Sequence, residues 1–323
     1  MNRGFWDKLK KPIIVLAPMA NVTDAAFRHM IAQHGRPDVT WTEFVSADGL
    51  ASVGRDKLLV DFWYEENQRP IVAQIFGANP ENIYKAAQLV KELKFDGLDI
   101  NMGCPDRAVL KQGAGGATIK NPKLAQEVIQ AAKEGSGLPV SVKTRLGVNK
   151  MQWEEWLPFL ADQDLAAITV HLRTVKELSL VPAHWELMPQ IVKLIDHKAL
   201  VLGNGDVLTL TDAEQKVRDT GADGVMIGRG IFGNPWMFNR EHPIEQIPIT
   251  QRLEAMIEHT KLFEEKFSHL KIGGKRFEVM KKHYKSYVNG FDGAKELRMK
   301  LMEAETAAQV EQMVREFLSL TKV

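Results

Sequence analysis

Short runs of apolar and β-branched residues recur along the first 240 residues, and the stretches between them have apolar positions that repeat with a helical period. This alternation predicts βαβ units and therefore a parallel sheet. The eight expected strands are residues 13–19, 39–45, 70–77, 97–103, 139–147, 166–173, 199–207 and 224–231. Eight strand and helix repeats in succession are what a closed (β/α)8 barrel requires.

The intervening helices support the same fold. Three of them have recognisable ends, at residues 79–93, 121–134 and 211–220. The first two open with Asn-Pro, which suits a cap and first turn, and the third is followed by Gly221, a common stop residue. An open, doubly wound sheet is the competing architecture, but it usually carries a glycine-rich fingerprint after its first strand. This sequence has Pro18-Met19-Ala20 there, so the barrel is favoured.

The pattern changes after about residue 241. Strand signals stop, and polar helices continue to the C-terminus with interruptions at Gly273-Gly274 and Asn289-Gly290. A length of 323 residues fits a barrel of roughly 250 residues with a smaller appendage. We therefore expect a TIM-barrel catalytic domain at residues 1–240 and a smaller, all-helical domain at residues 241–323.

Composition narrows the setting. Apolar residues make up 45% and charged residues 26%, values typical of a folded globular protein. The sequence has no apolar run of the roughly 18 residues that a membrane span needs, and its start lacks the apolar region of a signal peptide, so we expect a cytoplasmic protein without a membrane partner. A single cysteine excludes an internal disulfide and a multi-cysteine metal site, and we expect no metal.

Charge is unevenly distributed. The formal net charge is only +1, but residues 271–300 contain nine Lys or Arg against three Asp or Glu. Such a local excess suits a phosphate backbone, although a charge run by itself is more often a solvated helix face.

Polar residues gather where a barrel places its active site, at the C-terminal ends of the strands. They are Gln74 on the third strand, Asn101 and Cys104 on the fourth, Lys143 and Arg145 on the fifth, and His171 and Arg173 on the sixth. The seventh and eighth strands end in the glycine-rich turns Gly203-Asn204-Gly205-Asp206 and Gly228-Arg229-Gly230. Phosphate sites recur after these two strands in barrels, so a phosphorylated cofactor or substrate is implied unless both are simply tight turns.

Three side chains leave alternatives open. Lys143 lies in a β-branched strand and needs a carboxylate or an electron-rich ring if it points into the barrel mouth, but it can also point outward between helices. A lone histidine such as His171 is commonly a core residue. Cys104 can be a small buried hydrophobe, yet it stands in a Gly-Cys-Pro turn before the glycine-rich residues 112–116, which favours a chemical role.

Taken in order, these motifs resemble the tRNA-dihydrouridine synthase family over nearly the whole chain. The motifs are Ala17-Pro18-Met19, Thr42-Glu43, Asp99-Ile100-Asn101-Met102-Gly103-Cys104-Pro105, Lys143-Thr144-Arg145-Leu146-Gly147, His171-Leu172-Arg173-Thr174, Asn204-Gly205-Asp206 and residues 224–230. The C-terminal part is also similar to the family's helical RNA-binding domain, through Arg276, Lys281-Lys282-His283, Tyr287, Gly290 and Arg298.

The resemblance implies a barrel that binds FMN, uses NADPH as reductant and acts on tRNA, in a chain that we expect to be a monomer. The implied cofactor contacts are Pro18, Met19, Ala20, Gln74, Lys143, His171, Asn204, Gly205, Asp206, Gly228 and Arg229. The implied substrate contacts are Asn101, Arg145, Arg173, Lys281, Lys282 and Arg298, with Cys104 as the catalytic acid. Arg298 can instead be a structural ion-pair partner. Glu43 can touch substrate or hold a neighbouring loop.

The chain departs from the family after Arg173. The family usually has a glycine-tyrosine pair there, whereas this sequence continues Thr-Val-Lys-Glu-Leu-Ser-Leu, which changes the loop beside the substrate.

The implied reaction delivers hydride from reduced flavin to C6 of uracil and a proton to C5. A free thiol has a pKa of about 8.5, so Cys104 is mostly protonated at neutral pH and suits an acid role. No histidine in the same loop could activate it as a nucleophile. A uracil in folded RNA must be extracted at a cost of a few kcal/mol, which phosphate contacts can offset.

Other functions fit parts of the pattern. An FMN barrel acting on a small molecule, resembling a dihydroorotate dehydrogenase or an ene-reductase, would share the phosphate turns but would not need a basic helical domain. A flavin-free RNA-binding barrel would not need Cys104, Lys143 and His171. An aldolase-type barrel would use Lys143 for a Schiff base.

Overall fold

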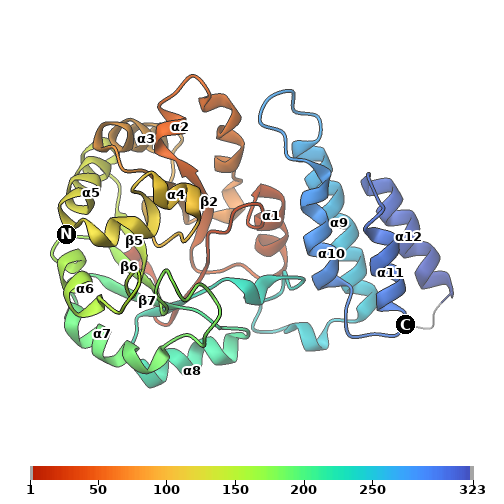
Figure 1. Cartoon of the computed structure of the whole chain (residues 1–323). Helices are drawn as coiled ribbons and strands as arrows, with labels where there is room; N and C mark the ends of the chain where they lie inside the picture. Colours follow the sequence, from red (N-terminus) through yellow and green to blue (C-terminus); the bar gives the residue numbers. More distant parts are fainter. Residues whose placement is uncertain (1–2, 321–323) are drawn as a thin grey trace.

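The computed structural model describes residues 3–320 and contains a sheet of eight parallel strands (Figure 1). The strands are β1 (Ile13–Leu16), β2 (Thr40–Ser46), β3 (Ile71–Phe76), β4 (Gly97–Met102), β5 (Val140–Arg145), β6 (Ala167–His171), β7 (Leu200–Asn204) and β8 (Gly224–Ile227). Neighbouring strands follow the order β1-β8-β7-β6-β5-β4-β3-β2, and a parallel bridge between Val15 and Val39 joins the two ends of this order. The predicted (β/α)8 barrel is confirmed.

Helices cover the outside of the barrel. They are α1 (Ala25–His34), α2 (Ala47–Leu50), α3 (Pro80–Glu92), α4 (Arg107–Lys111), α5 (Pro122–Ser136), α6 (Trp153–Ala161), α7 (Met188–Ile195) and α8 (Leu210–Thr220). The Asn79 side chain accepts hydrogen bonds from the first-turn N–H groups of α3, and Asn121 does the same for α5. Gly221 ends α8 with a φ of 72°, a left-handed conformation that favours glycine. The three helices predicted with recognisable ends are therefore confirmed.

Strand register aligns the polar strand ends. Asn101 is opposite Lys143, Arg145 is opposite His171, and His171 is opposite Asn204. Because parallel strands all end at the same edge, these residues form one row across the barrel mouth. The apolar residues of the strands fill the barrel interior and the layer beneath the helices, and almost all are buried.

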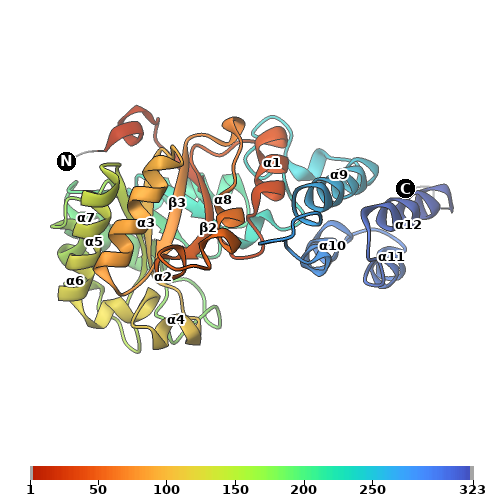
Figure 2. The same cartoon turned by 90° about the horizontal axis from the view of Figure 1, so that it is seen from above.

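Within residues 3–320, four further α-helices follow the barrel, and the C-terminal part is helical as predicted. They are α9 (Ile249–Phe267), α10 (Lys281–Tyr287), α11 (Ala294–Leu301) and α12 (Ala307–Leu320). They lie together on the α1 side of the barrel (Figures 1 and 2). Phe27 of α1, Phe263 of α9 and Ile227 of β8 belong to one buried hydrophobic cluster, so the helices and the barrel share a core. Across residues 3–320, no helix has both the length and the apolar character that crossing a membrane requires.

A buried ion pair crosses the same junction. Lys275, in the segment between α9 and α10, pairs with Glu43 in the middle of β2 and with Asp61 at 2.7 Å. The Lys275 and Glu43 side chains are 7% and 4% exposed. Glu43 also accepts a hydrogen bond from the Asn21 backbone N–H in the loop after β1. Of the two roles open to Glu43, the structure therefore shows it holding a neighbouring loop.

Candidate functional site

A cavity of about 390 Å³ opens at the C-terminal ends of the strands. Its wall is made of Ala17, Pro18, Met19, Pro105, Lys143, Arg145, His171, Arg173, Leu178, Ser179, Asn204, Gly205, Asp206, Val207, Leu208, Gly228 and Arg229. Most of the residues singled out from the sequence are thus brought together around one space, although they come from six different strand ends or loops. Parallel strands explain this convergence, because every strand delivers its last residues to the same edge.

Positive charge dominates the cavity wall. Lys143, Arg145, Arg173 and Arg229 line it, and Asp206 is the only carboxylate among the lining residues. Asp206 accepts hydrogen bonds from Arg173 and, at 2.7 Å, from Arg229, and the Arg173 contact is the main cause that lowers its pKa. Asp206 therefore orients two arginines, and the surplus charge favours an anionic ligand.

Lys143 is the least satisfied of these cations. Within residues 3–320 its ammonium makes no hydrogen bond and no ion pair. Burial, followed by repulsion from Arg145, lowers the pKa of Lys143 to about 8. Asp99 acts on the ammonium only through its charge, so the partly buried group lacks a direct acceptor, and its place in the cavity lining favours a ligand that supplies one.

His171 is neutral in this setting. Burial and the neighbouring cations, Lys143 first, hold its pKa well below the ordinary value for histidine. Arg173 Nη1 lies 3.1 Å from His171 Nε2, and because arginine can only donate, Nε2 must accept. The proton of the neutral ring is therefore on Nδ1.

The turn after β7 is supported from beneath by a tryptophan. Trp185 Nε1 donates a hydrogen bond of 2.8 Å to the Gly205 carbonyl. Its ring lies against Gly203, where an added Cβ would stand 2.4 Å from Trp185 Cη2. Gly205 has a φ of 126°, which side chains rarely adopt. Sequence reasoning missed Trp185, because nothing in its local sequence ties it to a turn 18 residues later.

The Cys104 turn is held by a chain of buried side chains. Asn101 Oδ1 accepts hydrogen bonds from the backbone N–H groups of Gly103 at 3.1 Å and Cys104 at 2.9 Å. Asn101 Nδ2 donates to Gln74 Oε1 at 3.1 Å, and Gln74 Nε2 donates to Asp99 Oδ2 at 2.6 Å. These contacts fix the turn relative to β3 and β4.

The thiol itself is half-buried. Burial is the main influence on the pKa of Cys104 and raises it, so the protonated form is favoured. The glycine-rich loop after α4 packs directly on this residue. Gly116 N–H donates to the Cys104 carbonyl at 3.0 Å, and a Cβ added at Gly115 would be 3.1 Å from Cys104 Cβ. The loop therefore approaches Cys104 as closely as it does because it lacks side chains.

Some predicted site residues lie outside the cavity lining. Ala20 is exposed, Gln74 and Asn101 are buried behind the wall, and Cys104 stands beside the lining residue Pro105. Lys281, Lys282 and Arg298 belong to α10 and α11. Conversely, sequence reasoning missed Leu178, Ser179 and Leu208, whose only signal is their place in the loops after β6 and β7.

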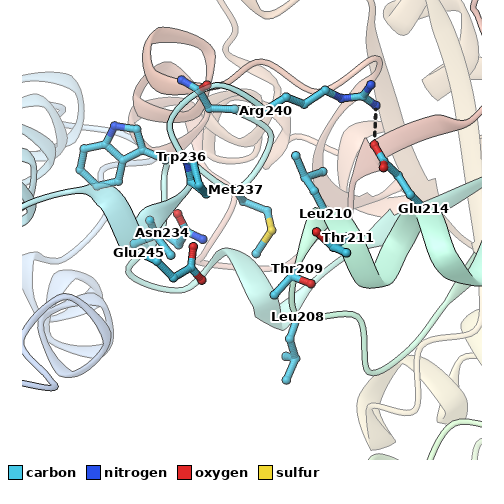
Figure 3. A pocket seen from close by; sticks show the side chains of 13 residues that line it. Leu208, Thr209, Leu210, Thr211, Glu214, Asn234, Trp236, Met237, Arg240 and Glu245 are labelled. Carbon is cyan, nitrogen blue, oxygen red and sulfur yellow. Dashed lines mark ion pairs between the residues drawn. The ribbon is translucent and has the colours of Figure 1, made fainter.

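A second, larger cavity of about 600 Å³ lies between the start of α8 and the segment leading to α9 (Figure 3). Leu208 is common to both cavities. The wall of the larger cavity contains Trp236, Met237 and the ion pair formed by Arg240 and Glu214 at 3.2 Å, but no lysine, histidine or cysteine. The smaller cavity is therefore the better candidate for an active site, because it holds the reactive groups.

Solved structures with a similar fold include histamine dehydrogenase from Rhizobium sp. 4-9, with a TM-score of 0.56 and 13% identity over 77% of this chain and 49% of that chain. Morphinone reductase has a TM-score of 0.51 and 16% identity over 74% of this chain and 87% of its own. At these identities the likeness concerns the fold alone.

Sequence comparison is more specific. The probable tRNA-dihydrouridine synthase 2 of Bacillus subtilis (strain 168) is 42% identical over 322 residues, covering 98% of this chain and 97% of the relative. A probable tRNA-dihydrouridine synthase of Staphylococcus aureus (strain MRSA252) is 40% identical over 330 residues, with 98% and 96% coverage. The family model described as dihydrouridine synthase (Dus) matches residues 15–322. With its strand-end cavity and its Gly-Cys-Pro turn, this chain belongs to the dihydrouridine synthase family.

Proposed function

We propose that this protein reduces uridines in tRNA to 5,6-dihydrouridine, with FMN as bound cofactor and NADPH as reductant. The observation that carries the proposal is the cavity at the strand ends. Lys143, which makes no direct hydrogen bond or ion pair among residues 3–320, lines it together with three arginines, and the Cys104 turn lies directly beside it. Family membership and the names of the relatives support tRNA as the substrate.

The residues present fit FMN. The turns at Gly205 and Gly228, together with Arg229, would hold its phosphate, as turns after the last two strands do in other barrels. Lys143 would face the electron-rich edge of the ring, with Pro18, Met19 and the neutral His171 against its faces, and Asn204 and Asp206 would shape the phosphate end. Ala20 and Gln74 would support these contacts from outside the lining. Reduced FMN supplies the hydride.

Lys143 would stabilise negative charge on the reduced ring, which is an electrostatic role. Its pKa of about 8 keeps most of the ammonium charged at neutral pH before any ligand binds. Replacing Lys143 by Met should therefore slow reduction of the bound flavin by NADPH, which stopped-flow absorbance would measure.

Cys104 would donate the proton that uracil C5 receives. Its raised pKa keeps the thiol protonated at neutral pH, so the acid is in the right form before the substrate arrives. Asn101 would face the uracil while it holds the Cys104 backbone. Arg145 uses Nε and Nη1 on backbone carbonyls, which leaves Nη2 for the substrate. Arg173 would complete the substrate side of the cavity.

The helical segment 241–323 would bind the RNA backbone through side chains of α10 and α11, among them Lys281 and Lys282. Such phosphate contacts position RNA without reading its sequence. Arg298 Nη1 donates to the Val288 carbonyl at 2.7 Å, so this residue would act partly by tying α11 to the end of α10. We propose that the enzyme works as a cytoplasmic monomer.

The test is a single-turnover experiment with the NADPH-reduced protein and unmodified tRNA, followed by mapping of dihydrouridine along the product. Formation of dihydrouridine at defined positions would support the proposal and identify the target. A protein that retains flavin but oxidises it only with small enones or orotate, and never with tRNA, would overturn it in favour of a small-molecule reductase.

A further inference from the structure

The loop that follows β6 is held unusually firmly for a surface loop. We call residues 174–182 the 174–182 loop. Within it, Glu177 Oε2 accepts the Thr174 N–H at 2.7 Å, and Glu177 also pairs with His184 at 3.2 Å. Leu180 N–H donates to the Glu177 carbonyl at 2.9 Å. The loop is thus closed on itself by local hydrogen bonds.

Arg145 fastens this loop to the Cys104 turn. Its side chain is buried, and its donors go to the carbonyls of Gly103 at 2.8 Å, Thr174 at 3.0 Å and Leu178 at 3.1 Å. Among residues 3–320, no carboxylate forms an ion pair with Arg145. Burying a guanidinium that binds only carbonyls costs desolvation free energy. What Arg145 provides in return is a fixed position of the 174–182 loop relative to the Cys104 turn.

Arg173 fastens the other half of the loop. Its Nε donates to the Val181 carbonyl at 2.6 Å, and its Nη2 binds Asp206 in the turn after β7. The Arg173 side chain is only 2% exposed. Two buried arginines therefore hold both halves of the 174–182 loop against the cavity.

What this rigid loop presents to solvent is apolar. Leu178 is 42% exposed and Leu180 is 80% exposed, and Ser179 between them is also exposed. Leu178 has a φ of 53°, a left-handed conformation that is strained for a non-glycine residue and persists only when its surroundings impose it. Leu178 and Ser179 line the cavity, so Leu180 stands just outside its mouth.

Exposed basic side chains stand in the segments that bound the cavity. Lys176 belongs to the loop and Arg229 follows β8, whereas the carboxylates of these segments are engaged, Glu177 by the Thr174 N–H and His184 and Asp206 by Arg173 and Arg229. Positive side chains around a small apolar tip suit a nucleic acid, which offers phosphates and the flat apolar faces of its bases. A protein or lipid partner would need a broader apolar surface than one loop provides.

We propose that the 174–182 loop receives the base next to the target uridine in the RNA, with Leu180 packed against the face of that base. This inference rests on the proposed function and adds the residue that supports the strand once the uridine has left its stack. Apolar side chains inserted beside unstacked bases stabilise distorted nucleic acids in this way. Arg145 makes the contact productive, because it fixes the loop relative to Cys104.

The experiment compares Leu180→Ala with Leu320→Ala, a matched control whose leucine is 84% exposed at the end of α12. Folding and bound flavin are verified first, and kcat/KM is then measured on unmodified tRNA mapped for its target uridine. We expect Leu180→Ala to lose roughly 5-fold in kcat/KM, the lower end of what an aromatic base-stacking contact contributes, because leucine packs on a base without a π-face. Leu320→Ala should keep the wild-type value, and Leu180→Phe should retain activity because an aromatic ring also stacks on a base.

A second substrate tests the occupant directly. Two RNAs are made, each lacking the base on one side of the target uridine. On one of them, the kcat/KM of wild type should fall as far as that of Leu180→Ala falls on intact RNA. On that same RNA, the kcat/KM of Leu180→Ala should fall little below its value on intact RNA. The loop's role alone is overturned if Leu180→Ala has wild-type activity on intact RNA. It is also overturned if removing either neighbouring base lowers the kcat/KM of Leu180→Ala by the same factor as it lowers that of wild type. A wild-type protein that reduces no RNA overturns the proposed function with it.

Discussion

The strand-end cavity and the junction between barrel and helices both bury charge, but they compensate it differently. At the junction, Lys275 meets two carboxylates, Glu43 and Asp61, and its side chain is only 7% exposed. In the cavity, Lys143 has no partner among residues 3–320, and Arg145 binds only backbone carbonyls.

The difference separates structure from function. A buried ion pair with matched partners is complete as it stands, and its loss is a stability effect. Lys143 is only partly buried and feels the charge of Asp99 without touching it, so its ammonium still lacks a direct acceptor, which a ligand can supply. Charge balance therefore favours the smaller cavity as the candidate site of chemistry, although the second cavity beside it is larger.

The largest expected effect is on the chemistry of the cavity. Cys104→Ala should reduce the single-turnover rate on tRNA by about 10²- to 10⁴-fold, because a positioned general acid typically contributes that much. Flavin content and thermal stability should change little, since only one sulfur of a half-buried side chain is removed. Rapid-quench analysis of dihydrouridine measures the rate, and a variant that still works at the wild-type rate would contradict the acid role.

The next effect belongs to the junction. Lys275→Met should lower the free energy of unfolding by about 3–5 kcal/mol, because it leaves the buried Glu43 without its cation. Urea titration measures the loss. The matched control is Lys295→Met, an exposed position in α11 where the change should stay within about 0.5 kcal/mol. Adding Glu43→Gln to Lys275→Met should recover part of the stability, and no recovery would mean that the pair is not the cause.

The third prediction concerns acid stability. His259 and His283 are fully buried with no hydrogen-bond partner at either ring nitrogen, and burial lowers the pKa of His283 to about 3 and that of His259 well below its ordinary value. Their rings contact each other and Phe27. In the unfolded chain both titrate near 6.5, so their contribution is complete above that pH and is lost as the pH falls from 6.5 toward 3.

Each buried histidine should steepen this loss by about 1.4 kcal/mol per pH unit. The comparison is between wild type and His283→Leu, with unfolding free energies measured by urea titration from pH 8 to pH 4. Subtracting the two curves removes the contribution of the buried carboxylates that titrate in both proteins. Parallel curves would show that His283 is solvated or already protonated in the fold.

The smallest effect is on the RNA-binding surface proposed for α10 and α11. Lys285→Ala, at an exposed position of α10, should weaken tRNA binding only a few-fold and reduce the slope of log affinity against log salt by about one. Lys193→Ala in α7 serves as the control, because it is equally exposed on a barrel helix. Filter binding at several salt concentrations measures the slope, and equal slopes for both variants would place the RNA elsewhere.

Charge counting along the sequence could not distinguish these surfaces. Lys275 belongs to the basic stretch 271–300, yet the fold buries it against Glu43 and removes it from any RNA surface. Arg298 likewise binds the Val288 carbonyl. A count of basic residues gives the local excess, but exposure depends on which element packs against each side chain.

The sequence by itself determined the elements and the edge at which chemistry collects. Periodicity of apolar residues, Asn-Pro caps and the Gly221 stop are local properties, and strand order follows from the barrel, so the row of polar strand ends was predictable. The position of the Cys104 turn just after β4 was also predictable, because the residues that form it are consecutive in the sequence.

Only the tertiary structure decided which polar groups are satisfied. The partners of Arg145, Lys275 and Trp185 lie 20 to 232 residues away or in separate loops, and no local pattern specifies such contacts. Whether a buried charge is compensated depends on the summed field of everything packed around it. This electrostatic field distinguishes Lys275, which is paired with two carboxylates, from Lys143, which makes no direct hydrogen bond or ion pair among residues 3–320. The field exists only once the chain has folded.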